Sequence, residues 1–233
     1  MFTLFKKELD YYLNNAVGYI VVILFAVFAN FLYVKDIFLN GSVSMKSFFG
    51  LIPWLFLIFI PAITMRAFSE EKRLNTIEVL LTLPVSEAKI VVAKFFTYIT
   101  LVLLALILTL SLPVSFYYLA HIYLPEVVVG YAGSVLMGAS FIAISMYFST
   151  LTKNQIVSFL SSIFVLFILL GTSSDLLSSF LPKFVQDMLI YFGPLYHFQN
   201  FAKGIVDVRS LYYFISITVL FLFLTVVNLE KRD

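Results

Sequence analysis

Six apolar stretches constrain this chain more than any other feature of its sequence. They run from Ala16 to Val34, Phe48 to Met65, Phe95 to Leu119, Val128 to Ser149, Gln155 to Gly171 and Leu211 to Leu229, and none contains Asp, Glu, Lys, Arg or His. A helix of about 20 apolar residues crosses the hydrocarbon core of a bilayer, where the backbone must satisfy its own hydrogen bonds. We therefore predict an all-α membrane protein with six transmembrane helices.

The composition points to a single membrane domain. Hydrophobic residues make up 62% of the 233 positions and charged residues 12%, whereas soluble domains have roughly one half and one quarter. Six spans use about half of the length, so we expect one domain over residues 1–233 with short loops. The net charge of +2, without a basic run among aromatic residues, argues against nucleic acid as a partner. The absence of cysteine excludes disulfides and thiolate chemistry.

Lysine and arginine are distributed unevenly between the two sides of the predicted bundle. If the N-terminus is cytoplasmic, the outer segments hold five of these residues and the inner segments hold ten: Lys6, Lys7, Arg66, Lys72, Arg73, Lys89, Lys94, Lys153, Lys231 and Arg232. Cytoplasmic loops of membrane proteins carry such an excess of positive charge. An even number of spans places both termini on the same side of the membrane. The excess of positive charge there leads us to expect that this side is the cytoplasm.

Residues 1–15 are expected to form an interfacial helix. Its apolar positions recur at three- and four-residue spacing, at Phe2, Phe5, Leu9 and Tyr12, and the polar residues Lys6, Lys7, Asp10 and Asn14 lie elsewhere on the helical wheel. That pattern is typical of an amphipathic helix in a membrane interface. A polybasic anchor is the alternative, but acidic residues offset the two lysines, so we favour apolar burial and docking to the bundle. The mixed charges and the lack of a cleavage site also argue against a signal peptide.

The stretch between the fifth and sixth spans, residues 172–210, is apolar but interrupted. Pro182, the pair Gly193-Pro194 and Gly204 divide it into pieces that are too short to cross a membrane. Proline suits the first turn of a helix and glycine suits its end. We therefore predict two outer half-helices, re-entrant or interfacial, that are separated at Gly193-Pro194. An apolar loop that only covers helix ends is the alternative.

A dense ionic segment, residues 66–94, lies between the second and third spans, on the predicted cytoplasmic side. Asn75 can cap a short helix from Thr76, with Glu78 returning a bond to the cap, until Pro84 ends that helix. Ser86 can then cap a second helix that continues into the third span.

The short helix has the features of a docking element. Ile77, Leu80 and Leu81 fall on one face, which gives a shape able to fill a groove in another protein. Charged residues precede it: Glu70, Glu71, Lys72 and Arg73. The alternative is that these residues are solvated loop charges that only enforce the topology.

Two further features concern helix packing. In the fourth span, Gly130, Ser134 and Gly138 lie four positions apart and let another helix approach closely. Because this pattern specifies only close contact, packing within one subunit and a seam between two subunits both remain open. The prolines inside spans are expected to kink helices or free carbonyls: Pro53, Pro61 and Pro113.

Several runs of sequence together carry a family resemblance. Met65-Arg66-Ala-Phe-Ser-Glu-Glu-Lys-Arg73 is followed by Thr76-Ile-Glu78, Leu80-Leu-Thr-Leu-Pro84 and Ser86-Glu-Ala-Lys-Ile-Val-Val-Ala-Lys94. Further matches are Phe5-Lys-Lys-Glu8 with Gly18-Tyr19, and His197 to Gly204 with Asp207, Arg209 and Tyr212 to Phe214. Over essentially its whole length the chain resembles type-2 ABC transporter permeases, and more narrowly it looks like the gliding-motility type permease branch.

The resemblance implies the permease subunit of an ATP-driven exporter in a bacterial cytoplasmic (inner) membrane. Two cytoplasmic ABC ATPase subunits and a second permease chain, identical or different, would complete the complex, and an outer-face protein could join it. The resemblance also implies ATPase-contacting or helix-positioning roles in the coupling segment: Arg66, Glu70, Glu71, Lys72, Arg73, Thr76, Ile77, Glu78, Leu80 and Leu81. The sequence contains no G-x-x-x-x-G-K-[ST] phosphate loop, so we expect no cofactor on this chain, and ATP and Mg in the partner subunit.

Three other functions were considered. Two of them fit the sequence less well, and the third fits it equally well. An ion-coupled transporter or channel needs intramembrane charges, a carbonyl filter or inverted repeats, which we do not find. An intramembrane enzyme needs a nucleophile with its base, or paired carboxylates, at membrane depth. The six predicted spans contain no acid and no histidine, so this function is disfavoured. A non-transporting subunit that passes ATP-driven motion to an outer protein needs the same coupling segment, so that alternative stays open. The sequence does not identify a transported substrate.

Overall fold

The computed structural model describes residues 2–41, 44–77, 85–119, 123–172, 183 and 190–231. Regular structure in these residues is helical throughout, and six helices are long and apolar enough to cross a membrane. They are α2 (Ala16–Asn40), α3 (Met45–Thr64), α6 (Glu87–Thr109), α8 (Leu124–Leu151), α9 (Gln155–Thr172) and α13 (Val208–Glu230). The prediction of an all-α membrane protein with six spans is therefore confirmed.

The third predicted span, Phe95 to Leu119, is divided in the structure. Helix α6 ends at Thr109, and α7 (Ser111–Leu119) follows after a turn at Leu110. Pro113 accounts for this break, because it has no N–H to offer the carbonyl of Thr109 and its ring disfavours a regular helical turn there. The single helix predicted across this stretch is thus two consecutive helices, joined at Leu110, within one candidate membrane span.

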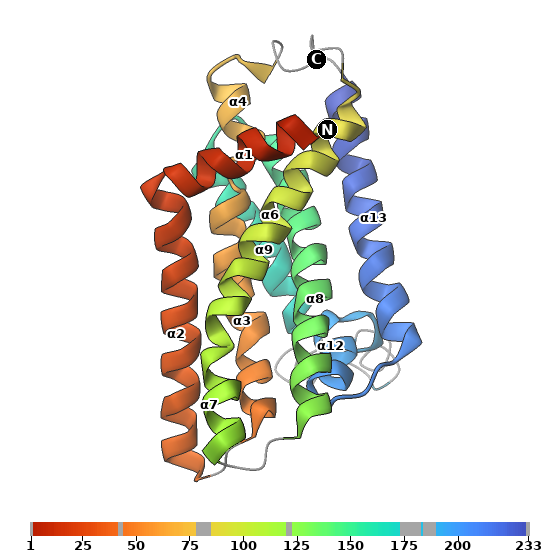
Figure 1. The fold of residues 1–233 in the computed structure, drawn as a ribbon. Coiled ribbons are helices and arrows are strands. Elements are labelled where there is room, and N and C mark those ends of the chain that lie inside the picture. The colour runs from red at the N-terminus through yellow and green to blue at the C-terminus, as the bar shows by residue number, and fades with distance from the viewer. Residues whose placement is uncertain are drawn as a thin grey trace.

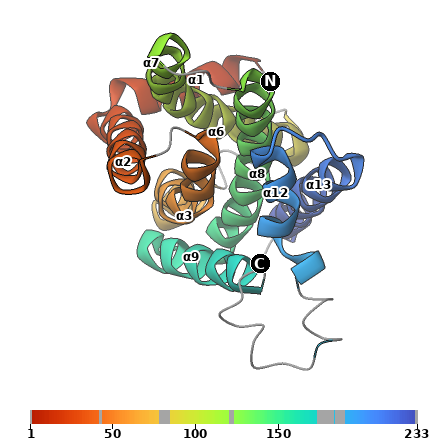
Figure 2. The same cartoon turned by 90° about the horizontal axis from the view of Figure 1, so that it is seen from below.

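Helix α8 lies at the centre of the bundle, as the view along the helices shows (Figure 2). It packs against α3, α6, α9 and α13 and against the short helix α12 (Pro194–Ala202). Every side chain from Ser140 to Met146 on α8 is buried. The N-terminal helix and the end of α13 lie at one end of the bundle, which we call the terminal end, and α7 and α12 lie toward the opposite end (Figure 1).

The small residues of α8 serve packing within this chain. A Cβ built on Gly130 would lie 2.2 Å from the ring of Phe49 on α3, and one on Gly138 would lie 3.3 Å from Phe56. Ser134 is fully buried, and its hydroxyl donates to the Gly130 carbonyl at 2.8 Å. Of the two packing modes that the pattern permits, close approach within one subunit accounts for these residues.

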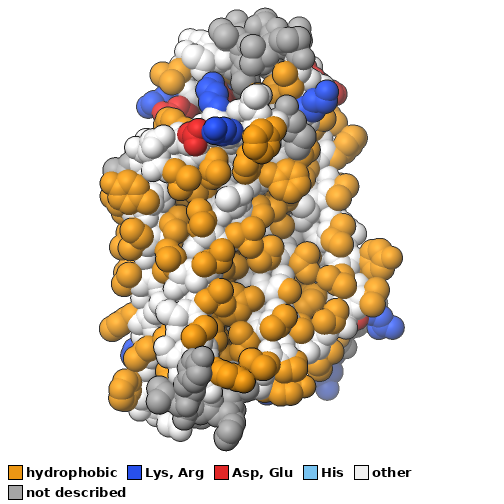
Figure 3. All heavy atoms as spheres, viewed as in Figure 1, with side chains coloured by type: hydrophobic (Ala, Val, Ile, Leu, Met, Phe, Trp, Pro, Cys, Tyr) orange, Lys and Arg blue, Asp and Glu red, His pale blue; other side chains and the backbone are white. Residues whose placement is uncertain are grey.

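The surface of the bundle is a broad apolar band with charges at its two ends (Figure 3). Large apolar side chains on the outer helices are more than half exposed, including Phe28 on α2, Phe164 on α9 and Phe223 on α13. The band covers helices that are each long enough to cross a membrane. Such a surface suits contact with lipid rather than water.

Residues 172–210 contain the second of the two predicted half-helices. Helix α12 begins at Pro194, after the N-cap Gly193, and the chain turns at Gly204 with φ +77°. Only glycine suits this turn, because its φ is positive and a Cβ there would lie 3.0 Å from the backbone nitrogen of Glu126. The first predicted half-helix falls mainly in residues 173–182 and 184–189, outside the described residues.

Candidate coupling site

The ionic segment after the second span lies at the terminal end of the bundle. Helix α3 ends at Thr64, a turn follows, and the chain then forms the short helix α4 (Ser69–Arg73). The hydroxyl of Ser149 on α8 holds this turn. It accepts the backbone N–H groups of Phe68 and Ser69 at 3.0 and 3.1 Å, and it donates to the Met65 carbonyl at 3.0 Å. One hydroxyl thereby uses its donor and both of its acceptor positions on a single turn.

Side chains on α4 and in the turn before it contact two other spans directly and a third through Thr150. The Lys72 ammonium donates to the Thr150 carbonyl on α8 at 2.6 Å, and the Arg66 Nε donates to the Gln155 Oε1 on α9 at 3.2 Å. From α13, the amide of Asn228 donates to the Thr150 hydroxyl at 2.8 Å. A displacement of α4 would therefore act directly on α8 and α9, and on α13 through Thr150.

The N-terminal helix α1 (Phe2–Asn14) joins the same site through a buried ion cluster. The ammonium of Lys94 on α6 lies 2.9 Å from the Glu8 carboxylate on α1 and 2.9 Å from the Glu71 carboxylate on α4. The Lys94 side chain is only 3% exposed, and its ammonium also lies 5.4 Å from the centre of the Phe68 ring. A buried charge is costly unless it is paired and hydrogen-bonded. Lys94 meets that condition only when α1, α4 and α6 are together.

A pair of tyrosines adds a second tie between α1 and α6. The Tyr12 hydroxyl donates to the Ile63 carbonyl on α3 at 3.1 Å and lies 3.0 Å from the Tyr98 hydroxyl, which therefore acts as the donor to Tyr12. The two rings meet edge to face, with 5.5 Å between their centres. Burial raises the pKa of Tyr12 to about 12, so its hydroxyl stays protonated at neutral pH.

A cavity of about 360 Å³, lined by charged and aromatic residues, lies beside the Lys94 cluster. Its lining has both signs of charge, with Lys7, Arg66, Glu70 and the members of the cluster. The second carboxylate oxygen of Glu71, Oε2, is buried and has no hydrogen-bond partner within the described residues. Glu71 thus keeps one unused acceptor at the joint between α1, α4 and α6.

The predicted start of the short docking helix differs from the structure. Asn75 adopts φ +54° and ends α4, with its N–H directed to the Lys72 carbonyl at 3.4 Å and the Thr76 N–H bonded to the Glu71 carbonyl at 3.0 Å. This is the hydrogen-bond pattern of a Schellman motif. An N-cap residue instead needs an extended backbone, so Asn75 does not begin a helix at Thr76. Asparagine suits both roles by composition, and only the backbone geometry separates them.

The remaining predicted coupling residues fall into an exposed and a partly buried group. Arg73, Leu74 and Thr76 are exposed at the tip of the segment, and Arg73 lies 3.8 Å from Glu70 in a weak surface pair. Ile77 is half-buried against the core of its own chain, so its side chain does not form a free knob. The other predicted members, Glu78, Leu80 and Leu81, lie outside the described residues.

The predicted interfacial helix is docked on the bundle. Helix α1 crosses the terminal end of α6 (Figure 1), where Phe5 lines a shallow pocket with Phe96, and Leu9 packs against the core. Phe2 is 76% exposed, and the charged residues of this helix that face solvent are Lys6, Lys7 and Asp10. Helix α1 is therefore part of the folded bundle.

The ion pair between Glu8 and Lys94 was not predicted from the sequence. A usable signal was present, because Glu8 lies on the same helical stripe as Phe5, Leu9 and Tyr12 rather than on the polar face. Lys94 likewise lies four residues before the buried Tyr98 on α6. A charge on an apolar stripe predicts a buried partner, although it does not identify which one.

The fold defines a multi-pass membrane protein with a polar joint at one end of its spans. A sequence model described as ABC-2 family transporter protein matches residues 2–229. The chain therefore belongs to the ABC-2 family, and it is the membrane, or permease, component of an ABC transporter, whose partners are ABC ATPase subunits. The narrower resemblance to the gliding-motility branch stays a prediction. A comparison with curated proteins found no match.

Proposed function

We propose that this chain is the permease subunit of an exporter and that it receives ATP-driven motion through residues 66–94. Two ATPase subunits would bind ATP and Mg and press on the exposed tip of the segment, which includes Arg73, Leu74 and Thr76. A second permease chain, identical or different, would complete the complex. The membrane would be the bacterial cytoplasmic membrane, with both termini in the cytoplasm, since the excess of Lys and Arg is at the terminal end.

The single observation that supports this proposal best is the three-way contact at Lys94. A load on α4 would reach α1 and α6 through the two 2.9 Å contacts of the Lys94 ammonium. The same load would reach α8 through Ser149. Packed elements that share buried ion pairs move together, because separating them would leave a charge unpaired in a low-dielectric site. Of the roles considered for Glu71, helix positioning fits this geometry best.

Affinity purification of the complex in mild detergent tests the proposal. We expect an ATP-binding subunit to accompany the wild-type chain and to be lost from Leu74→Asp, which places a carboxylate in the proposed docking surface. The matched control is Leu124→Asp, because Leu124 is 51% exposed and Leu74 is 58% exposed but the two lie at opposite ends of the bundle. An ATPase that never accompanies the wild type, or that accompanies Leu74→Asp equally well, would contradict the proposal.

The role of Lys94 calls for a second measurement. In Lys94→Met the exposed tip is unchanged, so we expect the ATPase subunit to remain bound while nucleotide-dependent transport in sealed vesicles is lost. If vesicles with the wild-type complex hydrolyse ATP but move no substrate, the chain instead passes motion to another protein on the outer face.

A further inference from the structure

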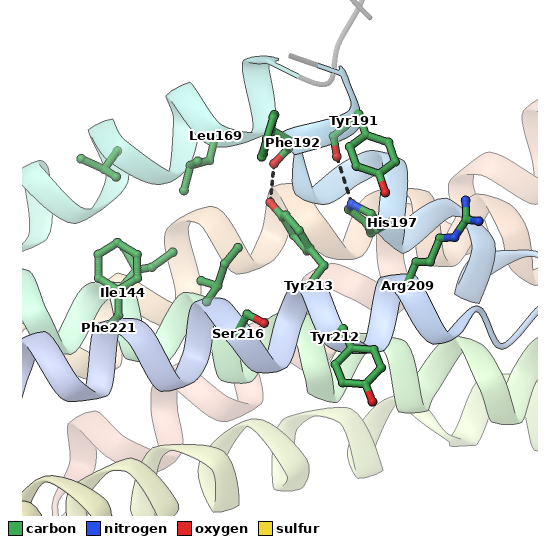
Figure 4. Close-up of a pocket in the computed structure, with 12 residues that line it drawn as sticks. Ile144, Leu169, Tyr191, Phe192, His197, Arg209, Tyr212, Tyr213, Ser216 and Phe221 are labelled. Carbon is green, nitrogen blue, oxygen red and sulfur yellow. Dashed lines mark hydrogen bonds between the residues drawn. The ribbon is translucent and has the colours of Figure 1, made fainter. Parts of the chain in front are cut away.

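A lateral groove lies between α9 and α13, far from the coupling site and near the end of the bundle that holds α12 (Figure 4). Its volume is about 530 Å³, and Ile144 of α8 forms part of its floor. Apolar side chains line one end, among them Leu169, Ile217 and Phe221. Arg209 lies at the other end, with Tyr191 close by. The groove therefore has one apolar end and one cationic end.

Hydrogen bonds within the chain hold the side chains that form the wall at the cationic end. His197 is 3% exposed, its Nε2 lies 2.9 Å from the Tyr191 carbonyl, and its Nδ1 lies 3.2 Å from the Ser210 hydroxyl. Tyr213 stacks on the imidazole at 4.1 Å and donates its hydroxyl to the Phe192 carbonyl at 2.6 Å. These polar atoms are satisfied within the chain, so the wall presents mainly carbon to the groove.

The length and depth of the groove match one leaflet of a bilayer. Arg209 is the second residue of α13 and Phe221 lies twelve residues later, near the middle of this span. At about 1.5 Å per residue the two are about 18 Å apart along the helix, slightly more than half of a hydrocarbon core of about 30 Å. The groove thus extends from the membrane interface to about the bilayer centre, as an acyl chain does.

The charge of Arg209 at the interface end has no ion-pair partner among the residues that the structure describes. The nearest acid along the chain, Asp207, accepts the Arg209 backbone N–H at 3.0 Å and the Asn200 amide at 3.3 Å. Figure 4 shows Arg209 rising from α13 on the same side as Tyr191 and His197. A guanidinium in this position presents a planar set of donors that fits the oxygens of a phosphate.

We propose that this groove binds one anionic glycerophospholipid. One acyl chain lies along Leu169, Ile217 and Phe221, and the phosphate contacts Arg209. An anionic lipid is favoured over phosphatidylcholine, because choline would carry a second positive charge to a site that already has an unpaired cation. This proposal does not rest on coupling to an ATPase, since neither the groove nor its lining touches residues 66–94.

Native mass spectrometry of the purified chain after stepwise delipidation tests the proposal, with phosphatidylglycerol and phosphatidylcholine as the probes. We expect one phosphatidylglycerol per chain to outlast phosphatidylcholine. Arg209→Gln should weaken phosphatidylglycerol retention about tenfold, as expected for the loss of a charge-assisted contact. Lys203→Gln is the matched control, because Lys203 is an exposed cation near the same end that does not line the groove.

A second variant tests the apolar end without removing charge. Leu169→Trp should fill the groove and displace both lipids, whereas Phe164→Trp, on the exposed face of α9, should retain them. Helical circular dichroism and gel filtration establish that each variant is folded. Equal retention of the two lipids by the wild type, or unchanged retention in both Arg209→Gln and Leu169→Trp, would overturn the proposal. A change of oligomeric mass in Leu169→Trp, without loss of lipid, would overturn it in favour of a second protein chain in the groove.

Discussion

The hydroxyls of Tyr12 and Tyr98 meet at 3.0 Å, although 86 positions separate them in the sequence. This contact fixes the N-terminal helix against the third span, one turn away from the place where Glu8 and Lys94 form their ion pair. Two different interactions thus join the same two helices, one neutral and one ionic. The terminal end of the bundle is a packed joint, and motion of α4 cannot leave α1 behind.

The two tyrosines should differ in their contributions to stability. Tyr12→Phe leaves the Ile63 carbonyl without its donor and the Tyr98 hydroxyl without its acceptor, so we expect a loss of about 1 to 3 kcal/mol. Tyr98→Phe removes only one donor, and about 0.5 to 1.5 kcal/mol is expected. Thermal unfolding in detergent measures the difference. Equal melting temperatures for the two variants would mean that the hydrogen bond from Tyr12 to the Ile63 carbonyl adds nothing measurable to the stability of the fold.

Lys94→Met should destabilise the bundle more than either tyrosine variant. It leaves the Glu8 and Glu71 carboxylates close together without a cation, which costs about 3 to 5 kcal/mol in fully buried pairs. We expect somewhat less here, about 2 to 4 kcal/mol, because the two glutamates keep some contact with solvent.

A triple variant separates the lost ion pair from lost packing. Lys94→Met combined with Glu8→Gln and Glu71→Gln removes all three charges, so most of the lost thermal stability should return. If the triple variant melts at the same temperature as Lys94→Met alone, repulsion between the carboxylates is not the cause of the loss.

The spans could be predicted from the sequence because hydrocarbon leaves the backbone almost no alternative to a helix. All six predicted spans correspond to helices, and the N-terminal helix and α12 lie where the spacing of apolar residues and of Gly and Pro indicates. A kink or a freed carbonyl was predicted at Pro113, but not that one helix would end at Thr109 and another begin at Ser111. Proline tolerates several outcomes in a membrane helix, and the surrounding packing selects one of them.

The candidate site was only partly predictable. Charge density and the family resemblance indicated residues 66–94, but the partners of Glu71 lie on two other helices, and contacts across helices are not encoded in local spacing. Ser149 gave no signal at all, since a serine in a membrane helix usually bonds to its own backbone. Asn75 shows the same limit, because one residue type serves both the start and the end of helices.

The small residues of α8 should have graded effects when they are enlarged. Gly130→Ala would place a Cβ 2.2 Å from the buried Phe49 ring, and overpacking of this kind costs about 1 to 3 kcal/mol. Gly138→Ala, at 3.3 Å from Phe56, should cost less. Gly50→Ala has no neighbouring atom within 4 Å and is expected to be neutral or slightly stabilising. The order of melting temperatures, Gly50→Ala above Gly138→Ala above Gly130→Ala, is the test.

His197 should make the end of the bundle that holds α12 sensitive to acid. Burial lowers the pKa of His197, opposed in part by its hydrogen bond to the Tyr191 carbonyl and by the Asp207 charge. In the unfolded chain the pKa returns to about 6.5, so between the two values the unfolded state binds more protons than the folded state. Stability therefore rises with pH across this window and is lost as the pH falls through it. We expect the wild type to lose melting temperature between pH 7.5 and 5, and His197→Gln, which cannot take up the proton, to lose less. A fall of the same size in both proteins would assign the acid sensitivity to other groups.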